Sequence, residues 1–67
     1  MNISINGNTK QFDGENMTIS DLIVTLNLVD KRLAIEKNGE IVPRSQFDAT
    51  ILSDGDKLEI VGAVGGG

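Results

Sequence analysis

The feature that most constrains the fold is that a single segment of the chain has a helical hydrophobic period. Four aliphatic residues recur there at i, i+3, i+4 and i+7, namely Ile19, Leu22, Ile23 and Leu26. This spacing places them on one face of a short helix. Thr18 and Asp21 stand where a capping box would begin that helix, and Asn27 can end it. One helix can cover one face of a sheet, so the remaining segments are expected to form that sheet.

Elsewhere the apolar residues alternate with polar ones, which is typical of strands with one buried face. The predicted strands lie around Ile3 and Ile5, over residues 10–13, around Leu33 and Ile35, over residues 41–42, and around Leu58 and Ile60. Asn6-Gly7 and Asn38-Gly39 tolerate positive φ and should each close a tight hairpin. Phe47 and Leu52 are the expected apolar anchors of a polar stretch, and Asp54-Gly55-Asp56 is an expected turn. This order of elements indicates an α+β roll.

The size of the chain limits it to one hydrophobic core. A protein of 67 residues buries only roughly 60% of the surface that its unfolded chain exposes. The sequence contains no cysteine, so neither a disulfide nor a thiolate-bound zinc ion can supplement that core. We expect a globular domain over residues 1–62, followed by a flexible glycine tail over residues 63–67.

The charge balance argues against nucleic-acid binding. Ten acidic and six basic residues give a net charge of −4, and Phe12 and Phe47 are the only aromatic residues. A nucleic-acid site usually needs a basic face and stacking aromatic side chains. The apolar runs are too short to span a bilayer, and the first residues lack the features of a signal peptide. We therefore expect a cytoplasmic protein that binds neither nucleic acid nor membrane and whose partner carries basic groups.

The side chains offer little to catalysis. Histidine and cysteine are both absent, which removes the commonest general base and the most reactive nucleophile. Residues 48–59 have the length of a calcium loop, but Thr50 and Leu52 replace two ligands and Ser53 stands where glycine is required. The isolated glycines do not form a phosphate-binding loop. The sequence thus predicts a protein that is not an enzyme and binds no cofactor or metal of its own.

The most unusual feature is the end of the chain, where a strand passes directly into Gly65-Gly66-Gly67. Glycines bury almost no surface and lose the most backbone entropy when ordered, so such a segment is expected to be flexible. Extended, the glycines reach about 10 Å beyond Val64. A tail without side chains can enter a narrow channel and deliver the carboxylate of Gly67 to a partner's active site. A frayed end is the alternative interpretation.

The chain resembles the ThiS sulfur-carrier family of thiamine biosynthesis over nearly its whole length. The resemblance rests on five stretches, Ile5 to Gly7, Thr18 to Leu22, Ala34 to Arg44, Asp54 to Val61 and Val64 to Gly67. It implies a ubiquitin-like β-grasp roll, in which a mixed sheet of four to five strands carries one helix across it and the first and last strands pair in parallel. Gly62 departs from the family pattern, because such proteins often have a larger residue there.

The resemblance also implies a mechanism. A separate ThiF-like adenylyltransferase would use ATP and magnesium to activate the carboxylate of Gly67, and a sulfur donor such as a cysteine desulfurase system would then displace AMP. The resulting thiocarboxylate would give its sulfur to thiazole synthase. Val64, Gly65 and Gly66 would thread the partner's active site.

A partner should also contact the body of the protein beside the tail. Val61 is expected on the face of the last strand opposite Leu58 and Ile60, and Glu59 shares that face. Glu59, Asp54 and Asp56 are expected near the point where the tail leaves. An isolated exposed valine and a solvated acidic rim are the alternative interpretations of these residues.

Two other functions remain open from the sequence. The small subunit of molybdopterin synthase is a similar roll that ends in two glycines, so the sulfur could serve the molybdenum cofactor. A ubiquitin-like interaction or conjugation module would instead join Gly67 to a lysine of a target protein.

Overall fold

The computed structural model describes residues 1–62 and shows five strands and one α-helix. The strands are β1 (Asn2–Ile5), β2 (Asn8–Gln11), β3 (Leu33–Lys37), β4 (Glu40–Val42) and β5 (Lys57–Gly62). The helix α1 spans Ile19–Thr25, and a short 3-10 helix, η1, spans Arg44–Gln46. The turn predicted at Asp54-Gly55-Asp56 is present directly before β5.

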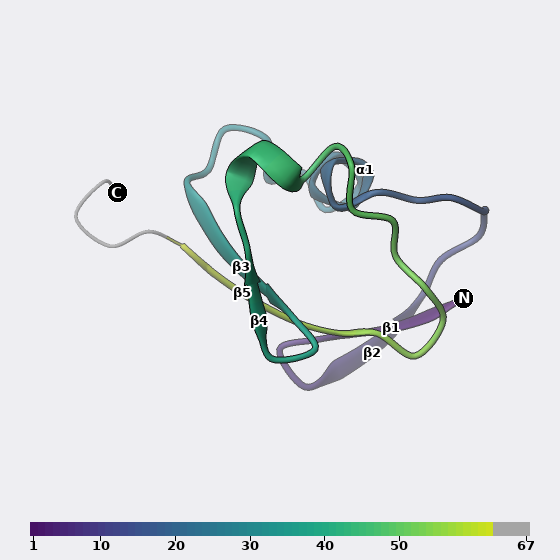
Figure 1. Ribbon diagram of the computed structural model, residues 1–67. Coiled ribbons are helices and arrows are strands. Elements are labelled where there is room, and N and C mark those ends of the chain that lie inside the picture. Colours follow the sequence, from purple (N-terminus) through teal and green to yellow (C-terminus); the bar gives the residue numbers. More distant parts are fainter. Residues whose placement is uncertain (63–67) are drawn as a thin grey trace.

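The five strands form one mixed sheet in the order β2-β1-β5-β3-β4. β1 and β5 pair in parallel, and every other neighbouring pair is antiparallel. Figure 1 shows α1 and the green turn of η1 on the same side of this sheet. The structure thus confirms the β-grasp arrangement and the parallel pairing of the first and last strands.

Local sequence signals account for most of these elements. Thr18 accepts a hydrogen bond from the amide of Asp21, whose side chain accepts one from the amide of Thr18, so the capping box is present. Asn27 has a φ of 60° directly after the helix C-cap, a left-handed conformation that ends a helix. Asn6-Gly7 and Asn38-Gly39 have positive φ at all four positions, as a two-residue hairpin of this type requires.

The core lies between α1 and the sheet. Nine apolar residues are buried there, namely Ile3, Ile5, Ile19, Leu22, Ile35, Phe47, Leu52, Leu58 and Ile60. Of the residues expected to face inward, Ile23, Leu26 and Leu33 are only partly buried and pack against this cluster. Burying each aliphatic side chain of this size contributes roughly 1.5–3 kcal/mol.

One predicted strand was misplaced. The strand expected over residues 10–13 is β2, at Asn8–Gln11, so Phe12 lies just beyond it. The two-residue turn pairs Ile5 with Asn8 and starts the return strand at once. All four β2 residues are exposed, and hydrophobic alternation therefore could not reveal the strand.

Candidate functional site

β5 carries the last described residues and occupies the middle of the sheet. It pairs with β1 on one side and with β3 on the other, where Gly62 lies opposite Leu33. The position of Gly62 is therefore fixed by the sheet. The predicted tail over 63–67, with Val64, Gly65, Gly66 and Gly67, lies outside the described residues, and its role stays a prediction.

The start of β5 is held by a polar network around Asp56. This carboxylate is 8% exposed and accepts hydrogen bonds from the amide of Ser53 at 2.8 Å and from Nδ2 of Asn38 at 3.0 Å. Nζ of Lys37 lies 3.9 Å from its Oδ2. Asn38 in turn accepts a bond from the amide of Lys57. The β3–β4 hairpin, the turn and β5 are thus joined at one point.

A second link holds the other half of β5. The side chain of Asn6 donates to the carbonyl of Ile60 at 3.0 Å and accepts from the amide of Ile60 at 2.8 Å. Asn6 follows β1, so this pair of bonds extends the β1–β5 contact toward Gly62. Only Val61 and Gly62 lie between this link at Ile60 and residue 63.

Val61 and Glu59 lie on the outer face of the sheet, opposite the side that α1 covers. Val61 is 61% exposed, and β4, which lies beyond β3, contributes Ile41, which is 76% exposed. Ala34 is the cross-strand neighbour of Val61. The predicted orientation of Val61, away from the buried Leu58 and Ile60, is confirmed.

The outer face also brings two like charges together. Glu59 lies directly opposite Glu36 in the β3–β5 pairing, an arrangement that destabilises a sheet unless a cation bridges the carboxylates. Within residues 1–62 neither carboxylate forms an ion pair. We name Ala34, Glu36, Ile41, Glu59 and Val61 the outer patch, which combines exposed aliphatic groups with unpaired negative charge.

The expectation that Asp54 and Asp56 lie near the tail was wrong. Both precede β5, whereas the tail follows it, and the six residues of β5 separate the two ends by roughly 20 Å at about 3.3 Å per residue. Asp56 is also buried and occupied by hydrogen bonds. Of the three acidic residues, Glu59 alone remains a candidate contact beside the tail.

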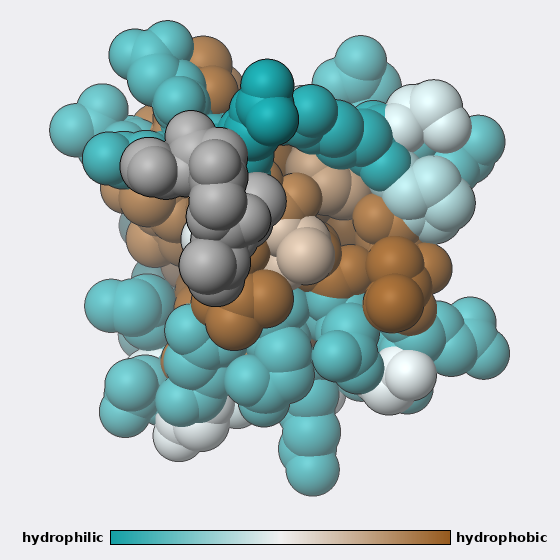
Figure 2. Space-filling model, turned by 90° about the vertical axis from the view of Figure 1, so that its left-hand side faces the viewer, coloured by the Kyte–Doolittle hydropathy of each residue, from teal (hydrophilic) through white to brown (hydrophobic). Residues whose placement is uncertain are grey.

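A hollow of about 600 Å³ opens beside Gly62, and we name it the exit hollow. Its aliphatic lining consists of Ile5, Leu26, Leu28, Leu33 and Ile60. Its remaining lining residues are Asn6, Asp30, Lys31, Arg32 and Gly62. Figure 2 shows this side of the molecule, where apolar side chains surround a depression and polar ones form the margin.

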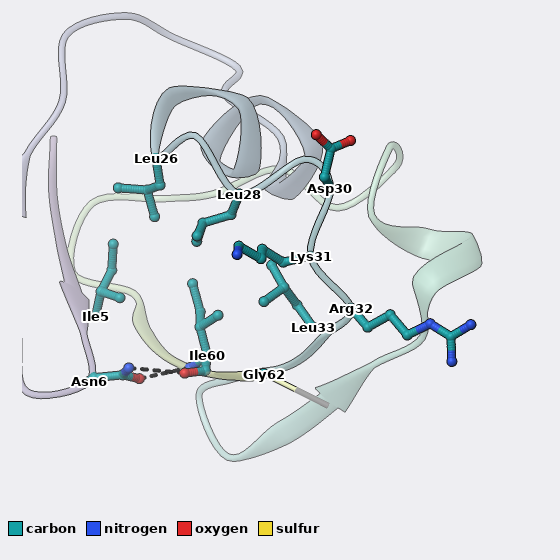
Figure 3. A pocket seen from close by; sticks show the side chains of 10 residues that line it. All are labelled: Ile5, Asn6, Leu26, Leu28, Asp30, Lys31, Arg32, Leu33, Ile60 and Gly62. Carbon is teal, nitrogen blue, oxygen red and sulfur yellow. Dashed lines mark hydrogen bonds between the residues drawn. The ribbon is translucent and has the colours of Figure 1, made fainter. Parts of the chain in front are cut away.

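Figure 3 shows how the charged residues of the exit hollow differ. The side chain of Lys31 points into the hollow, whereas Arg32 points away from it. The sequence analysis missed this site, because Leu28 and Lys31 belong to a segment without periodicity. The adjacent basic pair in an acidic chain was the signal that could have drawn attention to it.

Two further observations concern residues 1–62. No cluster of side chains there could hold a metal ion. No helix in this range is both long and apolar enough to cross a membrane.

The ThiS family matches residues 3–67. The sulfur carrier protein ThiS of Bacillus subtilis is 34% identical over 97% of this chain and 98% of its own length. The chain is 42% identical to a thiazole synthase of Paramagnetospirillum magneticum, but it spans only 20% of that protein.

Solved structures agree in fold. The crystal structure of a thiamine biosynthesis protein (ThiS) from Geobacter metallireducens superimposes with a TM-score of 0.85 at 35% identity, and the match covers 100% of both chains. A solution structure of a thiamine biosynthesis protein from the same organism gives a TM-score of 0.80 at 36% identity, covering 100% of this chain and 88% of the other.

Proposed function

The chain belongs to the ThiS family of sulfur-carrier proteins of thiamine biosynthesis, and we propose that it carries sulfur as a thiocarboxylate on Gly67. The proposal takes Gly67 as the terminal residue, so that its carboxylate is the reacting group. No side chain of this protein takes part in bond making.

The chemistry requires activation by a partner. A carboxylate is ionised at neutral pH and resists attack by a sulfur nucleophile. A ThiF-like adenylyltransferase would join it to AMP from ATP with magnesium, releasing pyrophosphate. A persulfide from a donor such as a cysteine desulfurase system would then attack the acyl carbon, and AMP would leave. A second thiol would cleave the resulting acyl disulfide, which gives the thiocarboxylate on Gly67 and leaves the donor as a disulfide. ATP and magnesium belong to the partner enzyme in this scheme.

The observation that carries the proposal is the position of Gly62 at the end of the central strand. β5 is bonded on both edges and anchored at Asp56 and Asn6. Five residues follow Gly62, and a chain of that length spans roughly 17 Å when extended. A rigid body thus presents a narrow, glycine-rich segment that fits a buried active site.

The outer patch supports a docking role beside the tail. Val61 directly precedes Gly62. The same face of the sheet carries Ile41 and the carboxylates of Glu36 and Glu59, which form no ion pair within residues 1–62. An apolar surface with a basic group on the partner would cover the valine and bridge Glu36 and Glu59. We propose this patch as the contact for the adenylyltransferase.

Thiazole synthase is the proposed acceptor of the sulfur. Two proteins named thiazole synthase contain a region similar to this whole chain. This links the domain to thiazole synthase and favours thiamine over the molybdenum cofactor as the pathway. In this chain the acceptor would bind the tail residues Val64, Gly65 and Gly66.

The intact mass of the chain tests the proposal. We expect one oxygen to be replaced by sulfur after incubation with a cognate adenylyltransferase, ATP, magnesium and a sulfur source. A chain lacking Gly67 should stay unchanged. Unchanged mass of the full chain beside an enzyme that demonstrably releases pyrophosphate would exclude the carrier role, and attachment to target lysines would indicate conjugation instead.

A further inference from the structure

The exit hollow and the outer patch lie on opposite faces of the sheet, at the same end of β5. Val61 and Glu59 face outward, whereas Ile60 is buried on the side that α1 covers and lines the hollow. Gly62 follows Ile60 by two residues, so a side chain at this position would also point to the α1 side. The point where β5 ends is therefore flanked by two different surfaces, one on each face.

We propose that the exit hollow is a second docking surface for the adenylyltransferase, which receives an apolar side chain of that enzyme with an acidic group beside it. An enzyme whose channel takes in the chain after Gly62 must surround the end of β5, and its channel mouth then meets both faces of the sheet. The inference rests on the proposed function, because it assumes that the adenylyltransferase acts on this chain. It adds the surface and the chemistry by which that partner is recognised on the α1 side.

Gly62 keeps the hollow open. It is one of the lining residues, and a Cβ added to it would meet no atom within 4 Å. A larger side chain at this position would therefore enter the hollow. With glycine there, the hollow has a volume of about 600 Å³, which is within the range of protein pockets that hold a ligand.

The apolar lining of the hollow is incompletely covered. Leu26, Leu28 and Leu33 are half-buried around it, and each has apolar surface left to bury. An apolar side chain from a partner would remove that surface from water, which favours binding. Side chains that fill a pocket near the centre of an interface usually contribute most of the binding free energy. The hollow offers such a pocket directly beside Gly62.

Charge distinguishes the two surfaces. The outer patch carries the carboxylates of Glu36 and Glu59, whereas the side chain of Lys31 points into the hollow (Figure 3). Lys31 forms no ion pair within residues 1–62, and Asp30 and Arg32 point away from the hollow. A matching channel mouth therefore has a basic group on the outer side and an acidic group on the α1 side. This polarity permits one orientation of the body and disfavours the reverse.

Charge reversal at Lys31 tests the ionic part. Lys31→Glu would place like charges together and should lower kcat/KM for adenylation about tenfold. Lys10→Glu is the matched control, because it makes the same change in net charge at an exposed residue of β2, which β1 separates from β5. Its kcat/KM should stay within about twofold of the unaltered chain. Equal losses in the two variants, or a normal kcat/KM in Lys31→Glu, would overturn the proposal.

Filling the hollow from within tests the apolar part. In Gly62→Leu the new side chain should cover the leucines, which raises the temperature of thermal unfolding. It should also exclude the side chain of the partner and lower kcat/KM about tenfold. Gly62→Ala fills less of the hollow and should lose less activity. A stabilised Gly62→Leu with normal kcat/KM would overturn the proposal, and so would equal losses in both variants, because the partner would then require the backbone freedom of glycine and not the space.

Two measurements separate this inference from the proposed function. The intact mass after prolonged incubation with excess enzymes and a sulfur source reports whether the thiocarboxylate forms, and kcat/KM reports how the body docks. A thiocarboxylate that forms with unchanged kcat/KM in both Lys31→Glu and Gly62→Leu would support the carrier role and overturn the docking surface. Normal adenylation with slowed sulfur transfer to thiazole synthase would also overturn it, because the hollow would then serve the acceptor.

Discussion

The two ends of β5 are built in opposite ways. At its start, Asp56 and Asn38 are buried or bonded in a network that joins three segments. At its end, Gly62 has no side chain, Val61 is exposed and the exit hollow lies open beside them. The two ends of this strand therefore serve different purposes. The start of β5 stabilises the fold, and the end of β5 leaves surface available for binding.

The largest effect is expected at the start of β5. Asp56→Ala leaves the amide of Ser53 and Nδ2 of Asn38 without their acceptor, which should lower the free energy of unfolding by about 2–3 kcal/mol. Chemical denaturation measures the change. Asp13→Ala is the control, because Asp13 is exposed and its side chain accepts no hydrogen bond within residues 1–62. A loss as large in the control would refute the anchoring role of Asp56.

A second effect is expected at the other end, on binding and not on stability. Val61→Asp places a charge in the outer patch beside Glu59, and loss of a central apolar contact should lower kcat/KM for adenylation of Gly67 about tenfold. Val24→Asp is the matched control, since Val24 is 65% exposed on α1, far from the outer patch.

Steady-state kinetics with the cognate adenylyltransferase and circular dichroism of both variants separate binding from unfolding. If Val24→Asp impairs adenylation as much as Val61→Asp, the outer patch is not the contact surface. A normal rate with Val61→Asp would lead to the same conclusion.

The sequence predicted the anchored part of the fold well, because its signals are local. The capping box at Thr18, the two Asn-Gly turns and the alternation around Leu58 each determine their element without distant contacts. β2 was displaced because its residues are all polar and its register follows from the Asn6-Gly7 turn. Asp56 was assigned to a solvated turn, since its burial depends on Asn38 and Lys37 from another hairpin.

The candidate site was less predictable than the fold, because only part of it depends on local sequence signals. The face of Val61 follows from a period of two, so its orientation could be derived. The exit hollow is assembled from β1, the segment after α1, β3 and β5. Such a site depends on tertiary packing, and no pattern within one segment encodes it.

The smallest effect is expected at Gly62, the last residue of β5. Glycine in a strand loses more backbone entropy on folding than alanine, and a Cβ at this position would meet no atom within 4 Å. Gly62→Ala should therefore raise the free energy of unfolding by about 0.5–1 kcal/mol. Gly55→Ala is the contrasting variant, because Gly55 has a φ of 90° and alanine would be strained there. Thermal unfolding of both should shift in opposite directions, and a destabilised Gly62→Ala would mean that the end of β5 needs the freedom of glycine even within the sheet.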